Sequence, residues 1–227
     1  MATQQLHRLS ASSLAVLLEC PRCFWLQVHE NLRRPSGPFP SLPSGVDGVL
    51  KTYFDQYRKK GKLPPDVEKL LPGTPFPRQD VLDTWRNNRL GIRTKRPDLG
   101  IELTGALDDL LQEGAMVTPL DFKTRGYPLK DDTHKYYQHQ LDLYAYLLEQ
   151  NGYRTSGRGF LLFLWPEEVR DGGLMKFRME AVEMFTSTQR AENLLTRAAQ
   201  LLKEPMPERH AACAFCQFVD SRTALAD

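Results

Sequence analysis

Two runs rich in apolar and β-branched residues, 101–111 and 116–124, flank the short segment 112–115. This pattern predicts a β-hairpin closed by a short loop that contains Gly114. If the hairpin turns about Gly114 and Ala115, Asp108 lies directly opposite Asp121, with the two Cβ atoms roughly 5 Å apart. Two carboxylates so placed repel each other, and a divalent cation between them removes the repulsion.

Alternation along the second strand places Asp121 and Lys123 on one face and Phe122 on the other. Lys123 adds a positive charge that suits an anionic substrate or an attacking water. A solvated hairpin face that carries two aspartates and a lysine is the simpler interpretation of the hairpin taken alone. A slip of one residue in the register would also send one aspartate to the other face.

The composition is that of a globular protein, because 41% of the 227 residues are hydrophobic and 26% are charged. We expect a single α/β domain over residues 1–227. The net charge of +2 is too small to indicate nucleic-acid binding by itself. Basic residues nevertheless gather in segments 85–96, 59–62 and 33–34, and such clusters are either solvated surface or a track for a phosphate backbone.

We expect a cytoplasmic protein without a membrane partner, since the sequence offers neither a secretory leader nor an apolar run that could span a bilayer. In that compartment cysteines are not expected to form structural disulfides.

Apolar periodicity and turn residues predict the remaining elements. Helices are expected over residues 10–26, 46–60, 134–150 and 186–203, and a short helix or turn over 79–90. We also expect an extended loop over 35–45, and strands over 158–165, ended by Pro166, and over 174–185. A mixed sheet with helices on its faces satisfies this order.

The four cysteines form two Cys-x-x-Cys pairs near the two ends of the sequence: Cys20, Cys23, Cys213 and Cys216. Four thiolates suit either an iron–sulfur cluster or tetrahedral zinc. Two pairs so far apart do not match a compact zinc ribbon. Coordination would join segments 10–30 and 205–220 across the fold, and His210 could compete as a zinc ligand.

Three short motifs follow one another along the chain: Gly-x-x-Asp at residues 105–108, Asp-x-Lys-Thr at 121–124 and Gln-x-x-x-Tyr at 140–144. Together they resemble the PD-(D/E)XK nuclease superfamily, and more narrowly the RecB-type nuclease domain and the CRISPR-associated RecB-like exonucleases. The resemblance implies a restriction-endonuclease-like core over about residues 45–203, with a mixed central sheet flanked by helices. It also implies terminal segments joined by a four-cysteine metal site.

In many members of this family, cysteines on both sides of the core hold a 4Fe-4S cluster. Their commonest arrangement is one cysteine before the core and three after it, and the two pairs here depart from it. The resemblance still favours the iron–sulfur cluster, with Zn²⁺ as the alternative.

The function implied by the resemblance is metal-dependent hydrolysis of DNA by an exonuclease, in DNA repair, recombination or CRISPR adaptation. The expected partner is DNA that is single-stranded or has free ends, with protein partners in a repair or CRISPR complex. A catalytically inactive nucleic-acid-binding scaffold, stabilised by its iron–sulfur or zinc site, is the alternative.

The resemblance also assigns roles to individual residues. Asp108, Asp121 and the carbonyl of Phe122 would hold Mg²⁺ or Mn²⁺, and Lys123 would orient or deprotonate the attacking water or neutralise the phosphate. Gln140 and Tyr144 would contact the DNA backbone and the Lys123 region. Asp47 stands near the place where the family often carries a His or Glu ligand, and an aspartate there would make the metal site all oxygen.

Overall fold

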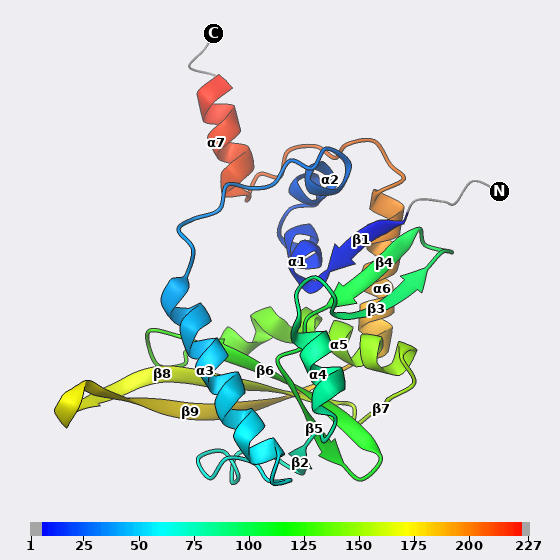
Figure 1. The fold of residues 1–227 in the computed structure, drawn as a ribbon. Helices are drawn as coiled ribbons and strands as arrows, with labels where there is room; N and C mark the ends of the chain where they lie inside the picture. Colours follow the sequence, from blue (N-terminus) through cyan, green and yellow to red (C-terminus); the bar gives the residue numbers. More distant parts are fainter. Residues whose placement is uncertain (1–5, 224–227) are drawn as a thin grey trace.

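The computed structural model describes residues 6–223 (Figure 1). The strands are β1 (His7–Ser10), β2 (Thr74–Pro75), β3 (Ile92–Arg96), β4 (Ile101–Gly105), β5 (Asp109–Glu113), β6 (Met116–Thr124), β7 (Arg154–Thr155), β8 (Arg158–Arg170) and β9 (Leu174–Phe185). The helices are α1 (Ala11–Glu19), α2 (Pro21–His29), α3 (Ser41–Arg58), α4 (Gln79–Arg86), α5 (Gln138–Gln150), α6 (Thr188–Leu201) and α7 (Ala214–Thr223), with short 3-10 turns η1 (Thr133–Tyr137) and η2 (Asp171–Gly173).

The larger sheet has the order β2-β5-β6-β8-β9, with β7 also paired to β6. It is mixed, because β6 and β8 run parallel while β5–β6 and β8–β9 are antiparallel. A smaller sheet, β1-β4-β3, combines the parallel pair β1–β4 with the antiparallel pair β3–β4. α3 lies over one face of the larger sheet and α5 over the other (Figure 1). This mixed α/β architecture confirms the predicted fold class.

Alternating residues of β8 enter two different apolar cores, as expected for a strand covered on both faces. Leu161 and Phe163 belong to the core beneath α5 and α6. Leu162 belongs to the core beneath α3, where the ring centroids of Phe54 and Phe122 are 4.9 Å apart. The strands that carry the predicted site are therefore held rigidly from both sides.

The predicted hairpin register is confirmed, since Asp109 pairs with Leu120 and Glu113 with Met116. Extended by one residue, this register sets Asp108 opposite Asp121. The prediction of one continuous strand over residues 101–111 is wrong. β4 ends at Gly105 and belongs to the smaller sheet, and residues 106–108 connect it to β5 in the larger one.

The close approach of α5 explains the glycine at the end of β4. A Cβ atom at Gly105 would lie 2.7 Å from Leu147 Cδ1 and 3.3 Å from the Tyr144 ring. A side chain at this position would push α5 away from the strand, so the motif glycine serves helix packing.

We expect Gly105→Ala to lower the free energy of unfolding by about 1–3 kcal/mol, the usual cost of overpacking a filled core. Denaturant unfolding measures this change. Gly37→Ala is the matched control, because a Cβ at Gly37 would meet no atom within 4 Å. Equal losses in both variants would contradict this account of Gly105.

Other predicted boundaries also need correction. The helix expected over residues 10–26 is broken at Cys20, which is extended (φ −159°, ψ 106°). The cause is Pro21, which disfavours helical backbone in the residue before it and is well suited to the first position of the next helix. α3 begins at Ser41, inside the predicted loop 35–45, because Pro43 is tolerated in a first helical turn.

The strand expected to stop at Pro166 continues as β8 to Arg170. β6 pairs with β8 only as far as Leu164, so no strand within residues 6–223 pairs with that side of β8 at Pro166. The β8–β9 register also shifts between Pro166 and Glu168. A proline is accommodated where a strand is at an edge or a bulge. None of the helices within residues 6–223 combines the length and apolar character needed to cross a membrane.

Candidate active site

The predicted catalytic residues share one open cleft of about 680 Å³. They reach it from the β4–β5 connection, from β6 and from α5: Asp108, Asp121, Lys123, Gln140 and Tyr144. α1 and the residue before it supply another part of the wall, including Ser10, Val16 and Glu19. Segments distant in sequence thus meet at the two opposed aspartates.

Asp108 is held in place by backbone from the opposite strand. Its Oδ2 accepts a hydrogen bond from the Phe122 backbone N–H (2.9 Å), and its Oδ1 forms an ion pair with Lys51 Nζ (2.7 Å). The Phe122 side chain points to the other face of the sheet, into the core beneath α3. The alternation predicted from the sequence is therefore present.

The Asp121 carboxylate lies where negative charge is unfavourable, since only 1% of the residue is exposed. Its Oδ1 accepts a hydrogen bond from Gln140 Nε2 (2.8 Å). Its Oδ2 forms an ion pair with Lys123 Nζ. Burial and repulsion from Asp108 raise the pKa of Asp121 to about 7, against the opposing effect of Lys123.

A divalent cation fits this donor set. Asp108, Asp121 and a backbone carbonyl such as that of Phe122 are hard oxygen donors, which Mg²⁺ and Mn²⁺ prefer. A cation between the two carboxylates would relieve their repulsion, which contributes to the raised pKa of Asp121.

Gln140 connects the three sequence motifs. Its Oε1 accepts a hydrogen bond from Lys123 Nζ (3.0 Å), and its Nε2 donates to Asp121 and to Tyr144 Oη (2.8 Å each). Tyr144 Oη in turn donates to the Ala106 carbonyl (2.8 Å). Burial, Asp121 and Asp108 raise the pKa of Tyr144 well above its ordinary value, so the phenol stays protonated and can donate. The network fixes the orientation of the Lys123 ammonium.

Asp47 lies one ion pair away from the aspartates. Its Oδ2 is 2.7 Å from Lys51 Nζ, which also contacts Asp108. Burial lowers the pKa of Lys51, but the two aspartates outweigh it and the net shift is upward. Sequence reasoning missed Lys51, although Asp47 and Lys51 are four residues apart and therefore share one face of α3.

A buried ionic cluster behind the cleft was also missed. Asp109 is bound by Arg58 (Nη2–Oδ1 2.6 Å) and by Arg86 (Nη2–Oδ2 3.1 Å), and the Asp109 and Arg58 side chains are at most 2% exposed. Arg86 Nε also donates to the Asp108 carbonyl (2.7 Å). This cluster supports the backbone that carries Asp108.

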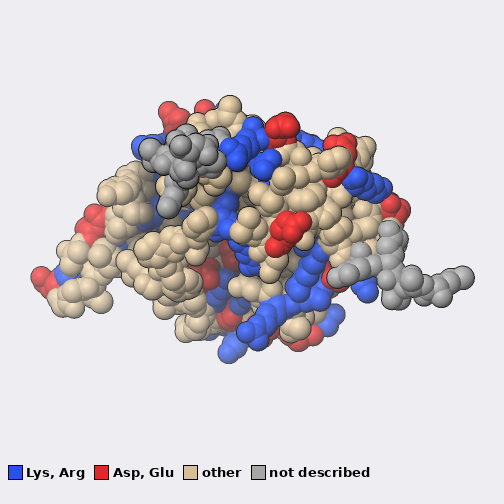
Figure 2. Space-filling view, turned by 90° about the horizontal axis from the view of Figure 1, so that it is seen from above, with Lys and Arg blue, Asp and Glu red and all other residues tan. Residues whose placement is uncertain are grey.

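The basic run at residues 85–96 is only partly available to a ligand. Arg86 belongs to the buried cluster, and Arg96 pairs with Asp98 and Glu192. Arg89 and Lys95 are exposed. Figure 2 shows Lys and Arg side chains in and beside a hollow on the face seen from above.

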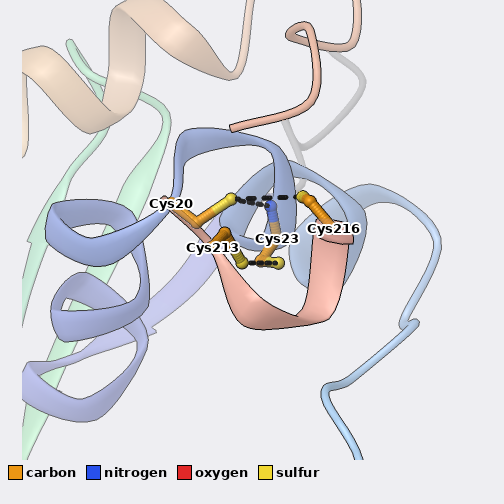
Figure 3. A group of neighbouring side chains, drawn as sticks. All are labelled: Cys20, Cys23, Cys213 and Cys216. Atoms are coloured by element: carbon orange, nitrogen blue, oxygen red, sulfur yellow. Dashed lines mark hydrogen bonds between the residues drawn. The ribbon is translucent and has the colours of Figure 1, made fainter. Parts of the chain in front are cut away.

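The two Cys-x-x-Cys pairs come together, as predicted. Cys20 and Cys213 directly precede α2 and α7, and Cys23 and Cys216 lie in the first turns of these helices. All four Sγ atoms lie within 4.8 Å of one another (Figure 3). The cysteines are at most 9% exposed, and none is in a disulfide. His210 is outside this group, and its backbone carbonyl accepts a hydrogen bond from the Cys213 N–H (3.0 Å).

Comparison with known proteins identifies the family of the chain. A family model described as the PD-(D/E)XK nuclease superfamily matches residues 78–221, which include the three motifs and the second cysteine pair. No curated protein matches the chain. Members of this superfamily are nucleases that use divalent metal ions. Because the match covers more than half of the sequence, the chain belongs to the PD-(D/E)XK nuclease superfamily.

Proposed function

We propose that this protein is a divalent-metal-dependent deoxyribonuclease that removes nucleotides from DNA ends. The observation that carries the proposal is the pair of opposed carboxylates, Asp108 and Asp121, beside the Lys123 ammonium in an open cleft. The RecB-like resemblance supports exonuclease action and a place in DNA repair, recombination or CRISPR adaptation, with protein partners in such a complex.

In this proposal Asp108, Asp121 and the Phe122 carbonyl would hold one or two Mg²⁺ or Mn²⁺ ions. Asp47, which pairs with Lys51 in this structure, would have to leave that ion pair to serve as a further oxygen ligand. A bound metal lowers the pKa of a water and stabilises charge on the scissile phosphate. Lys123 orients that water and offsets the phosphate charge. Gln140, held by Tyr144, keeps the Lys123 ammonium beside Asp121.

Single-stranded DNA or a free DNA end is the substrate that the cleft wall supports. Tyr136 and Tyr137 both line the cleft, and Tyr136 is 79% exposed. Exposed aromatic rings stack on unpaired bases irrespective of their sequence. The exposed Arg89 and Lys95 lie in the segment that follows α4 and suit contacts with phosphates.

The decisive test is digestion of end-labelled single-stranded DNA with Mg²⁺ or Mn²⁺ by the parent protein and by Lys123→Met. We expect Lys123→Met to cleave about 10²–10³-fold more slowly, the usual effect of removing one group that stabilises transition-state charge. Lys176→Met is the control, because Lys176 is on β9 and pairs with Glu167 outside the cleft.

Circular single-stranded DNA distinguishes an exonuclease from an endonuclease. An exonuclease needs a free end and leaves the circle intact. Full activity in a folded Lys123→Met protein would refute the assigned role of Lys123. DNA binding by the parent without hydrolysis in either metal would identify a scaffold instead of an enzyme.

A further inference from the structure

The spacing of the four cysteine sulfurs discriminates between the two metal groups that their chemistry allows. Cys20 Sγ lies 3.8 Å from Cys216 Sγ, and Cys23 Sγ lies 3.7 Å from Cys213 Sγ (Figure 3). Each of these contacts joins the N-terminal pair to the C-terminal pair. No two of the four sulfurs are more than 4.8 Å apart.

A single zinc ion requires such a spacing. With a Zn–S bond of about 2.3 Å, the edge of a regular tetrahedron of sulfurs is about 3.8 Å. In a 4Fe-4S cluster each thiolate is bonded to a different iron, so the thiolates stand farther apart than around one shared ion. The observed separations fit one ion and leave too little room for four irons with their sulfides.

Two contacts beside the sulfurs favour negative charge on them. Cys20 is the N-cap of α2, and its Sγ accepts the Cys23 backbone N–H (3.4 Å). Arg34 Nη2 lies 3.8 Å from Cys213 Sγ, and Arg34 also pairs with Glu19. Four thiolates around a dication leave a net negative charge, which a neighbouring guanidinium offsets.

We propose that Cys20, Cys23, Cys213 and Cys216 bind one Zn²⁺ ion in a tetrahedral, structural site. The ion closes a link between α2 and α7, and it fixes α1, which precedes Cys20 directly and lines the cleft. This inference does not depend on the proposed nuclease activity, because metal content and stability report on it without any substrate.

The test begins with protein purified without oxygen from cells supplied with both iron and zinc. We expect about one zinc per chain by elemental analysis, and neither acid-labile sulfide nor the visible absorption of an iron–sulfur cluster. About four irons and four sulfides per chain would overturn the proposal, as would a folded protein that contains neither metal.

Reconstitution guards against replacement of iron by zinc during expression. Metal-free protein is offered Zn²⁺ alone, or Fe²⁺ with sulfide and reductant, and the melting temperature is recorded in each case. We expect Zn²⁺ to restore the melting temperature and the iron mixture to leave it low. A larger increase with iron and sulfide would overturn the assignment.

Two substitutions at one ligand sharpen the result. Cys213→His should retain about one zinc, because three cysteines and one histidine form an ordinary structural zinc site. Cys213→Ser should lose the zinc and lower the melting temperature. Retention of zinc with an unchanged melting temperature in Cys213→Ser would show that Cys213 is not a ligand.

Discussion

Asp121→Asn is expected to abolish metal-dependent cleavage while the protein remains folded. The substitution keeps the shape of the side chain but removes a buried charge that faces Asp108. Without metal, we expect the melting temperature to change by no more than about 4 °C, which corresponds to about 1 kcal/mol in a chain of this size. The rate of cleavage should fall by at least about 10²–10³-fold, the usual loss when one group that stabilises transition-state charge is removed.

Metal-dependent stabilisation gives a second measurement of the same role. A ligand present at 100 times its dissociation constant stabilises the native state by about 2.7 kcal/mol. The parent should therefore melt at a higher temperature with Mn²⁺ than without it, and Asp121→Asn should lose most of this increase. Asp171→Asn, in the exposed turn between β8 and β9, is the control and should keep both the activity and the metal response. An unchanged metal response in Asp121→Asn would exclude Asp121 as a ligand.

Replacement of Asp109 by asparagine is expected mainly to lower stability, whereas replacement of the adjacent Asp108 is expected mainly to lower activity. Asp109→Asn removes the close anion of the buried Arg58 guanidinium and leaves it only the longer contact from Nε to Asp55 Oδ1 (3.4 Å). Breaking a buried ion pair from one side costs about 3–5 kcal/mol, a large share of the roughly 5–15 kcal/mol that stabilises a typical protein. Denaturant unfolding should show this loss directly.

Asp108→Asn should lower activity more than stability. Asp108 lines the cleft and its side chain is 18% exposed, so the substitution should abolish cleavage and cost far less stability than Asp109→Asn. The two variants differ by one position and by the face of the chain on which the side chain lies. Equal losses of stability in both would contradict the division between a cleft residue and a buried structural residue.

Local chemistry explains why much of the site could be predicted from sequence. The hairpin register depends on Gly114 and the two runs beside it, and it brought Asp108 opposite Asp121 without any knowledge of the remaining chain. The helix that carries Gln140 and Tyr144 has a clear apolar pattern. Both features are set by residues that are close together in sequence.

The missed features depend on contacts between distant residues. The break after Gly105 follows from the approach of Leu147 on α5, and a run of apolar residues contains no sign of it. β1 has only four residues and exists because β4 pairs with it. Asp109 and Arg58 are 51 positions apart, and neither residue type indicates burial until the partner is known. The break at Cys20 was visible in Pro21.

The meeting of Cys20 with Cys216 also imposes an order in time. The two residues are 196 positions apart, so a ribosome must synthesise nearly the whole described chain before the second cysteine pair can reach the first. Until then α1 has no link to α7, and the cleft wall that α1 supplies is not secured from that side. The part of the cleft wall that α1 supplies is therefore secured from that side only after the segment that carries Cys213 and Cys216 has been synthesised.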